Sequence, residues 1–398
     1  MHLLDLAPHA SLPPMDGADK RAWHLYEEMV KAGAQGSFIG RTIFVRGLGS
    51  PQPHSPPHSW RDRKLIAALA ACCARQDYRQ FKHLLPGARR VVADAARESY
   101  DAVLVCFLFA LPLAHPFLDR PIRLVVDTHN YDPDWYASMA SSSRNPILRH
   151  LCRIGIRYSE RALRHLPSGT VLVHVSEADA NLYRRHRPDL EHIIVENGTT
   201  VRPRAKAPDY VAPGKKTLIF VGSLSAQMNQ DALQYFASRF WPVLREDALF
   251  HVVGSNPPPA VHRLCADNGW TLHPSVIQEQ LEDLYAQAHF SVLPFQYGAG
   301  SKLKFLEACG RGVPVLATSA GLCGVTNPPD LTMLSDIPSE WHRQIQTQRE
   351  PAAQCIQRLV SFAEAFAWPS LARRLADTIQ GAPLIDRSSN HPYPRRAE

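Results

Sequence analysis

One short segment, YGAGSKLKFLE (297–307), combines flexible backbone, a hydroxyl, cations and an acid. Gly298 and Gly300 allow a tight turn and a close approach of the backbone to a ligand. Ser301 and Lys302 then begin a predicted helix, whose free N–H groups and dipole favour an anion. The segment is therefore predicted to bind a phosphate group.

Glu307 follows Lys302 and Lys304 by about one helical turn. The two lysines offset the negative charge of a phosphate. An ionised carboxylate only accepts hydrogen bonds, so beside a phosphate Glu307 would repel the ligand. Aimed at a ribose diol, it would accept two hydrogen bonds, and the set then suits a nucleoside diphosphate. The simpler alternative is a solvated helix face with an i,i+3 pair between Lys304 and Glu307.

The elements that must position these residues form two series of apolar runs separated by helical patterns. Continuous apolar runs of this kind are typical of parallel strands covered on both faces. Two series predict an α/β fold with two Rossmann-like domains, whose ligands bind outside the carboxyl ends of the strands. The predicted parts are domain 1–205, linker 201–216, domain 206–380 and a disordered tail 381–398.

The order of motifs adds a family resemblance. FVGSLSAQMNQDAL, HVVG, LYAQAHFSVLPF, GAGSKLKFLEACGRGVPVLAT and AGLCGV resemble the nucleotide-sugar half of GT-B glycosyltransferases of retaining family 4. The branch it resembles carries the signature G-x-G-[ST]-[KR]-x-K-x-x-E. More weakly, PPMDGADKRAWHLYEEM, DTHN, VSEADANLY and ENGT resemble the first domain. The resemblance implies a GT-B fold, in which two Rossmann-like domains face each other across a cleft.

On the donor side, the resemblance implies residue roles. It makes Lys302 the main partner of the diphosphate, helped by Lys304, and places the ribose on Glu307. It also implies that the backbone around Val276 contacts the base and that the loop after the first strand of this domain borders the donor. The predicted donor-binding residues are Gly222, Ser223, Val276, Gly298, Gly300, Ser301, Lys302, Lys304 and Glu307.

Three departures from the family pattern leave alternatives open. Ala299 stands where many relatives have a glutamate, the loop GSLSAQMNQ lacks the usual cations, and Pro274 replaces a glycine two residues before Val276. The loss of the glutamate motivates a non-catalytic sugar-nucleotide-binding protein or an inactive transferase. A sugar-nucleotide epimerase of the same fold is a third possibility, although no acid/base set for it is identified.

On the acceptor side, polar residues follow two predicted strands of the first domain. His129 and Asn130 end an apolar strand, which directs them into the predicted cleft, and the family has a cleft histidine there. Asp16 and Gly17 lie in the first strand-to-helix loop, which we expect to shape the acceptor pocket. Arg21 is either an acceptor ligand or a charge on the helix surface.

The resemblance implies transfer with retention at the anomeric carbon, with His129, Lys302 and Glu307 as the predicted catalytic residues. No second carboxylate is placed as a nucleophile, so a front-face displacement is expected. The spacing Asp-x-Asp occurs only in DPD (132–134), on the acceptor half. We therefore expect no cofactor and no essential metal.

Charge and composition bound the partners. The net charge of +7 lies entirely before residue 211, where Lys and Arg outnumber Asp and Glu by 28 to 21, against 16 to 16 afterwards. This charge is either an ordinary solvated surface or a contact for an anionic membrane, through the basic segment 60–85. A nucleic acid is less favoured, because no nucleic-acid-binding motif accompanies the charge. The start MHLLDLAPHA predicts no secretory signal. Scattered cysteines predict reduced thiols. We expect a cytoplasmic enzyme with a glycan, lipid-linked or small-molecule acceptor, and peripheral attachment to the inner membrane face is an open alternative.

Overall fold

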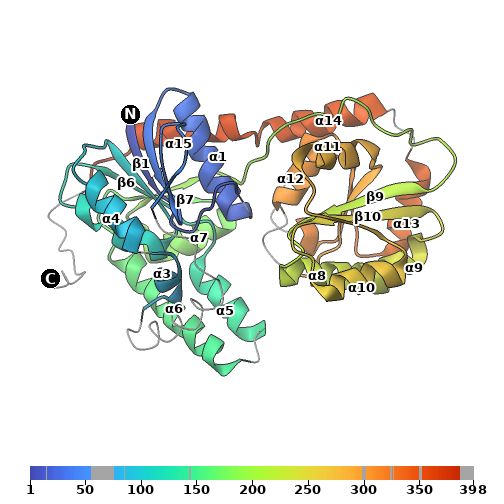
Figure 1. Ribbon diagram of the computed structural model, residues 1–398, viewed down its shortest axis with the longest axis horizontal. Coiled ribbons are helices and arrows are strands. Elements are labelled where there is room, and N and C mark those ends of the chain that lie inside the picture. The colour runs from blue at the N-terminus through green and yellow to red at the C-terminus, as the bar shows by residue number, and fades with distance from the viewer. Residues whose placement is uncertain are drawn as a thin grey trace. The chain divides into compact units, whose positions relative to one another are not determined.

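The computed structural model describes residues 1–14, 16–54, 76–84, 86–142, 145–297, 302–322, 325, 327–348 and 352–385, without the side chains of Phe81, Ser142 and Lys302. The chain divides into two compact units. Unit 1 contains residues 1–196 and 371–398, and unit 2 contains residues 197–370. Figure 1 shows the two units.

Unit 1 contains an eight-stranded sheet in the order β4-β3-β2-β1-β5-β6-β7-β8. All neighbours are parallel except β2–β3 and β3–β4, which add an antiparallel edge that the sequence did not predict. The strands are β1 (His2–Leu6), β2 (Gln35–Ile39), β3 (Ile43–Arg46), β4 (Gln52–Pro53), β5 (Ala102–Cys106), β6 (Arg123–Asp127), β7 (Val171–His174) and β8 (Glu191–Ile194).

Helices cover this sheet, and its central strands are buried on both faces, as their continuous apolar sequences predict. The strand β5, AVLVC, is buried at all five positions. The helices are α1 (Gly17–Lys31), α3 (Tyr78–His83), α4 (Pro86–Ala95), η1 (Leu108–Leu113), η2 (His115–Phe117), α5 (Asp132–Ser142), α6 (Pro146–Arg164) and α7 (Glu177–His186).

Unit 2 contains a six-stranded sheet in the order β11-β10-β9-β12-β13-β14. Every pairing is parallel. Numbered within the unit, this is the 3-2-1-4-5-6 order of the Rossmann fold. The strands are β9 (Lys216–Val221), β10 (Ala248–Gly254), β11 (Thr271–Pro274), β12 (Phe290–Leu293), β13 (Val315–Ala317) and β14 (Thr332–Leu334).

The helices α8 to α12 fall where the sequence predicts them between these strands, whereas α13 and α14 were not predicted. Aromatic side chains fill much of the core, where Phe236, Phe240 and Trp341 are fully buried. The helices are α8 (Gln227–Tyr235), the π-helical turn η3 (Phe236–Phe240), α9 (Trp241–Leu244), α10 (Pro259–Asn268), α11 (Gln278–Gln287), α12 (Lys302–Gly310), η4 (Ala320–Leu322), α13 (Pro338–Thr347) and α14 (Ala352–Glu364).

The unit boundaries differ from the predicted ones. The chain passes into unit 2 after Glu196, nine residues before the predicted boundary at 205. The predicted linker, 201–216, belongs to unit 2. Arg204 is buried in unit 2 and donates to the carbonyl oxygens of Tyr285, Ala288 and Gly312 and to the Tyr210 hydroxyl. A buried guanidinium requires such partners, so this basic stretch is part of unit 2.

The last helix, α15 (Trp368–Gly381), begins in unit 2 and continues in unit 1. Beyond it, the Ile385 N–H donates to the Ile122 carbonyl, and Arg123 donates to the Ala382 carbonyl. Ile385 is only 4% exposed. The predicted disordered tail therefore does not start at residue 381, and its remainder, 386–398, lies outside the described residues.

Five of the eight cysteines lie in the described part of the chain. All five are buried and none of them forms a disulfide, as expected for core thiols. Among the described residues, no helix has both the length and the apolar character needed to cross a bilayer. Most of the segment predicted to touch a membrane, including residues 60–75, lies outside those residues.

Candidate active site

The predicted donor residues of unit 2 follow two neighbouring central strands. Gly222 comes directly after β9, and α12 begins after β12, which pairs with β9. From β9 the chain goes next to β10 on one side and later to β12 on the other, so the topology reverses there. Ligands of open α/β sheets bind at the carboxyl ends of strands at such a point.

Gly222 and Lys304 lie side by side at this edge. A Cβ on Gly222 would lie 2.9 Å from Lys304 Cε and 3.0 Å from Asn229 Nδ2. The Lys304 ammonium lies 5.5 Å from the centre of the Phe295 ring. Asn229 donates to the Ser223 carbonyl at 2.7 Å and so holds the loop after β9. The structure therefore places a lysine from α12 directly against the loop that follows β9.

Glu307 is half-buried on α12, next to a network built around Arg311. Arg311 donates to both Glu282 oxygens at 2.9 Å and to the Glu307 carbonyl at 3.0 Å. Its guanidinium lies 4.5 Å from the centre of the Tyr285 ring. Burial opposes the charge of Arg311, but Tyr285 and the two acids outweigh it and raise its pKa. Arg311 thus ties α12, which carries Glu307, to α11.

The other predicted donor residues are placed less completely. Val276 is half-buried just after β11, at the carboxyl end of that strand, and Ser275 before it has φ +55°. The Ser223 hydroxyl lies 3.1 Å from that of Ser225. Gly298, Gly300 and Ser301 lie outside the described residues, and for Lys302 the structure gives its place as the first residue of α12.

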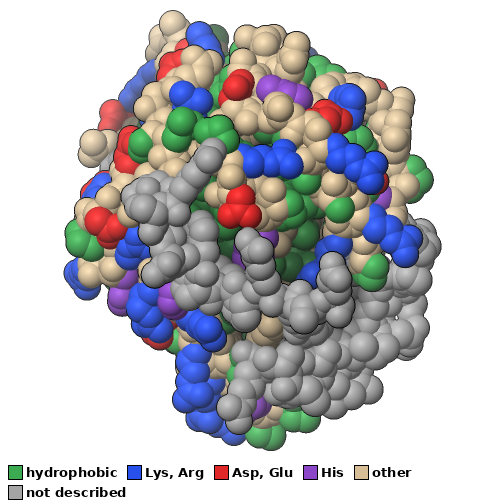
Figure 2. All heavy atoms as spheres, turned by 90° about the vertical axis from the view of Figure 1, so that its left-hand side faces the viewer, with side chains coloured by type: hydrophobic (Ala, Val, Ile, Leu, Met, Phe, Trp, Pro, Cys, Tyr) green, Lys and Arg blue, Asp and Glu red, His purple; other side chains and the backbone are tan. Residues whose placement is uncertain are grey.

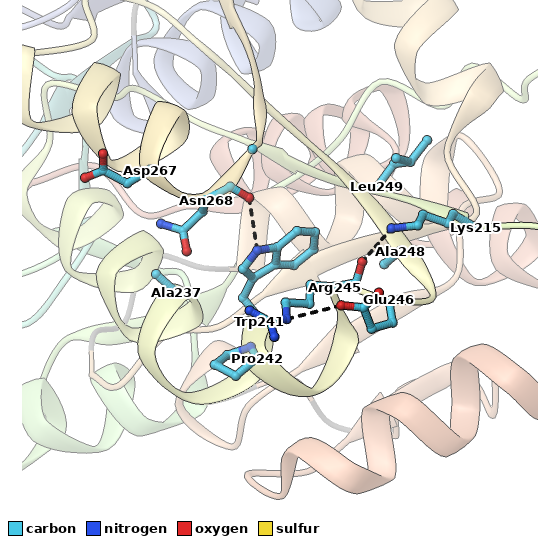
Figure 3. A pocket seen from close by; sticks show the side chains of 11 residues that line it. Lys215, Ala237, Trp241, Pro242, Arg245, Glu246, Ala248, Leu249, Asp267 and Asn268 are labelled. Atoms are coloured by element: carbon cyan, nitrogen blue, oxygen red, sulfur yellow. Dashed lines mark hydrogen bonds and ion pairs between the residues drawn. The ribbon is translucent and has the colours of Figure 1, made fainter.

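A hollow on unit 2 lies at the amino ends of the strands, away from the carboxyl ends that carry the predicted donor residues (Figure 3). It is lined by Lys215, which precedes β9, and by Ala248 and Leu249, the first two residues of β10. Trp241 beside it donates to the Asn268 carbonyl at 3.1 Å. Because this is the amino end of the strands, the hollow is separate from the predicted donor residues.

In unit 1, three aromatic rings gather where β1, β5 and β6 end. His129 stacks on Phe107 with ring centroids 4.1 Å apart, and His9 meets both rings edge-on at 4.9 Å from Phe107 and 5.5 Å from His129. His9 follows β1, Phe107 follows β5 and His129 follows β6. Since β1 neighbours both β2 and β5, this is the topological reversal of the first sheet.

Arg21 and Asp127 form a buried ion pair beneath these rings. Arg21 Nε and Nη2 donate to the two Asp127 oxygens at 2.7 and 3.1 Å, and Nη1 donates to the Glu196 carbonyl at 2.8 Å. Arg21 is fully buried. The alternative of a helix-surface charge is therefore wrong, and the guanidinium is engaged within unit 1. Burial raises the pKa of Asp127, but Arg21 outweighs burial and lowers it overall.

His129 is held neutral in this setting. Burial lowers its pKa to about 3, despite Asp127 with Oδ2 3.5 Å from its Nε2. Within the described part of the chain, this buried Nε2 makes no hydrogen bond, and the ring nitrogens of His9 are buried near the Ala18 backbone. Burial likewise lowers the pKa of His9 to about 4. Such buried polar atoms are costly unless a ligand or water satisfies them.

The ligand atoms of Cys106, Asp127 and His129 lie within 4.8 Å of one another, close enough to consider a metal. Arg21 already binds both oxygens of Asp127, however, so a cation there would have to replace a guanidinium. The expected independence of metal stays a prediction.

The remaining predicted acceptor residues lie at the same edge of the first sheet. Asp16 caps α1, accepting from the N–H groups of Ala18 and Asp19 at 2.9 Å, and Gly17 is the first residue of that helix. Asn130 follows His129, and its backbone is held by the Tyr183 hydroxyl. Asp16 therefore has a structural partner already, whereas the side chain of Asn130 is half-buried.

Three residues of these sites were not predicted. His9 lies in the first strand-to-helix loop, where its position just after β1 was an available signal. Asn229 and Arg311 act on the donor side through the Ser223 loop and through Glu282. Nothing in the local sequence distinguishes them from helix-surface residues, because their partners are distant in the chain.

Comparison with solved structures identifies the class of fold. Starch synthase IV from Arabidopsis thaliana, bound to ADP and acarbose, is 11% identical with a TM-score of 0.59, covering 96% of this chain and 98% of that one. WaaG, a glycosyltransferase involved in lipopolysaccharide biosynthesis, is 16% identical with a TM-score of 0.59, covering 96% and 100%. Anabaena HepE in complex with UDP-glucose is 14% identical with a TM-score of 0.59, covering 96% of this chain and 100% of that one. The chain has the α/β fold, with parallel sheets, of these GT-B glycosyltransferases.

Comparison of sequences adds the kind of domain. Residues 215–347 match a family model described as "Glycosyl transferases group 1". This stretch runs from β9 to α13 and includes both strands that carry the donor residues. The second unit thus contains a glycosyl transferase group 1 domain. No curated protein sequence matches the chain.

Proposed function

We propose that the protein is a retaining glycosyltransferase that moves a sugar from a nucleoside-diphosphate donor to a hydroxyl group of an acceptor. One observation carries the proposal. Lys304 on α12 lies against Gly222 at the topological reversal of a Rossmann-ordered sheet, within the stretch that matches the glycosyl transferase group 1 family. UDP and UDP-glucose in the HepE structures support a donor of this class.

The proposed donor site assigns a role to each residue. The start of α12, with Lys302 and Lys304, holds the diphosphate and stabilises the charge that grows on it as the sugar leaves. Glu307 accepts hydrogen bonds from the ribose hydroxyls, and the backbone around Val276 contacts the base. Arg311 fixes the helix that carries Glu307.

The proposed reaction is a front-face displacement. The acceptor oxygen forms a bond to the anomeric carbon on the face from which the diphosphate leaves, and the carbon–oxygen bond to the diphosphate breaks. The acceptor proton passes to the leaving phosphate oxygen, so no protein base is required. The protein contributes positioning and electrostatic stabilisation.

On the acceptor side, His129 and His9 are the proposed contacts. Both rings are neutral at physiological pH, because burial lowers their pKa values to about 3 and about 4. A neutral ring has one donor and one acceptor nitrogen, which matches a sugar hydroxyl that both donates and accepts. Asn130 and the backbone of Gly17 complete the proposed site.

We propose cytoplasmic function without a cofactor or essential metal, in the synthesis of a surface polysaccharide, a lipid-linked glycan or a glycosylated metabolite. The similarity to WaaG, a glycosyltransferase involved in lipopolysaccharide biosynthesis, supports the first two acceptor classes.

The experiment is a thermal-shift screen of UDP-, GDP-, dTDP- and ADP-sugars with EDTA present, followed by transfer assays with the donor that binds. A donor at 100 times its Kd is expected to stabilise the protein by about 2.7 kcal/mol. NMR of the product should show an unchanged anomeric configuration. Inversion would contradict the mechanism, and activity that returns only with Mg²⁺ or Mn²⁺ would contradict metal independence. Binding without turnover would favour the non-catalytic alternative, and a changed donor sugar would favour an epimerase.

A further inference from the structure

The helix α6 presents a row of arginines to solvent. Five of its residues, Arg149, Arg153, Arg157, Arg161 and Arg164, follow one another at spacings of four, four, four and three. Spacings of three and four keep residues on one side of a helix, since a turn takes about 3.6 residues. All five side chains are exposed, whereas the opposite face of α6 packs into unit 1.

The five arginines extend along most of the length of α6. At about 1.5 Å per residue, Arg149 and Arg164 are separated by roughly 22 Å along the helix, and about 100° per residue places all five within an arc of roughly 120°. Figure 2, which keeps the vertical axis of Figure 1, shows Lys and Arg side chains gathered at its lower left. We call the five arginines the α6 basic face.

The α6 basic face has few partners for its charges among the described residues. In the described part of the chain, none of the five guanidinium groups takes part in an ion pair or hydrogen bond. By contrast, Arg184 and Arg187 on and after α7 are paired with Glu177 and Asp189. The acid within the arc of the basic face is Glu160, which is half-buried. Five cations against one acid leave a strong local positive charge.

An apolar side chain lies beside this face. Ile147, in the first turn of α6, is 60% exposed. The helix is firmly held, because the Tyr136 ring of α5 packs where a Cβ on Gly155 of α6 would lie only 2.4 Å from it. A rigid helix with a basic face and an exposed apolar end is suited to the interface of an anionic membrane.

We propose that the α6 basic face docks the protein on an anionic phospholipid surface, with Ile147 inserted among the headgroups. The proposal rests on the proposed function, since a lipid-linked acceptor would be presented there. It concerns a surface distinct from segment 60–75. Ile147 favours a lipid surface over a nucleic acid, which offers no apolar layer at its phosphate backbone.

The test is sedimentation of the full chain with vesicles, either of pure phosphatidylcholine or with 30% phosphatidylglycerol. The variant is Arg153→Glu/Arg157→Glu/Arg161→Glu. The control, Arg239→Glu/Arg263→Glu/Arg343→Glu, reverses three exposed arginines of unit 2 and lowers the net charge equally. Each basic residue near a membrane contributes about fivefold to partitioning, so the variant should lose at least about a hundredfold and the control less than about tenfold.

Ile147→Ser is expected to weaken partitioning about threefold to tenfold without changing its salt dependence. Equal binding of wild type and the α6 variant to anionic vesicles would overturn the proposal, as would equal binding to both vesicle types. So would displacement of the protein from vesicles by a single-stranded RNA at equal phosphate concentration. Thermal shift with a sugar nucleotide on the same variants separates the two claims. If no protein, including the wild type, binds a sugar nucleotide, the proposed function is contradicted but the docking surface is not.

Discussion

At the scale of single residues, the two candidate sites use their cations differently. All three donating nitrogens of Arg21 are engaged by Asp127 and Glu196 inside unit 1. Its charge therefore holds Asp127, which lies next to His129. Lys304 instead extends along Phe295 to the loop at Gly222. The sequence suggested a ligand role for both, and their identities alone do not distinguish them. The distinction comes from Asp127, 106 residues further along the chain.

Lys304→Met is expected to lower kcat/KM for the donor by about tenfold to a hundredfold, because it removes a positive charge facing the diphosphate but keeps the stem packed on Phe295. The measurement is steady-state kinetics at varied donor concentration. Lys215→Met, which removes a lysine bound to the Arg245 carbonyl on the same unit, is the control. If both variants behave alike, the role of Lys304 is wrong.

Glu307→Gln should raise the Kd of the nucleoside diphosphate about tenfold, since hydrogen bonds to a charged acceptor are worth about 1 kcal/mol more than neutral ones. Isothermal titration of the variant measures this. Glu364→Gln, an exposed acid on α14, should bind as the wild type does. Unchanged affinity together with a large loss of stability would make Glu307 a structural acid.

At the scale of elements, the local sequence pattern determines which segments form helices and strands, and long-range packing determines which unit each segment joins. The apolar runs predicted the core strands of both sheets and the helices α8 to α12, because continuous burial leaves a clear local signal. The sequence of α15, with Leu371, Leu375 and Ile379 at helical spacing, also indicates a helix. It does not indicate that the helix continues into unit 1, which depends on the distant contacts of residues 382–385 with Ile122 and Arg123. The two-residue strand β4 is too short to be visible in any pattern.

The close approach of α12 to the loop after β9 gives a prediction at this scale. In Gly222→Ala, the new Cβ would press on the flexible end of Lys304 and on the Asn229 amide. We expect KM for the donor to rise about tenfold with kcat little changed, and the free energy of unfolding to fall by less than about 1 kcal/mol. Gly381→Ala, where an added Cβ meets open space, is the control. A loss of stability without a change in KM would contradict the proposed donor site.

At the scale of the whole molecule, neutral buried histidines are concentrated in unit 1. In unit 1, burial lowers the pKa values of His129 and His174 to about 3 and that of His9 to about 4, and it lowers that of His83 well below its usual value. In unit 2, burial lowers the pKa of His289 to about 4 and also lowers those of His251 and His273. In the unfolded chain these groups have a pKa of about 6.5. Below that value the unfolded state binds protons that the folded state does not, so stability falls as pH drops from about 6.5 to about 4.

Acid should therefore unfold unit 1 before unit 2. Each of these histidines contributes about 1.4 kcal/mol per pH unit. Asp5 in unit 1 offsets part of this loss, because burial raises its pKa and the folded state therefore binds a proton there at acid pH. Hydrogen exchange followed by mass spectrometry at pH 7 and pH 5 measures the two units separately. His174→Gln should reduce the pH dependence of unit 1, and His289→Gln should leave it unchanged. Equal loss of protection in both units would contradict this assignment.

The central claim is that the loop after β9 and the start of α12 form the donor site of a glycosyltransferase. The most direct measurement is release of the nucleoside diphosphate from a sugar nucleotide by wild type and by Lys302→Ala, with thermal unfolding of both proteins recorded in parallel. We predict that Lys302→Ala unfolds like the wild type but releases product about 10²–10³ times more slowly. Product release at the wild-type rate by a well-folded Lys302→Ala protein would contradict the claim.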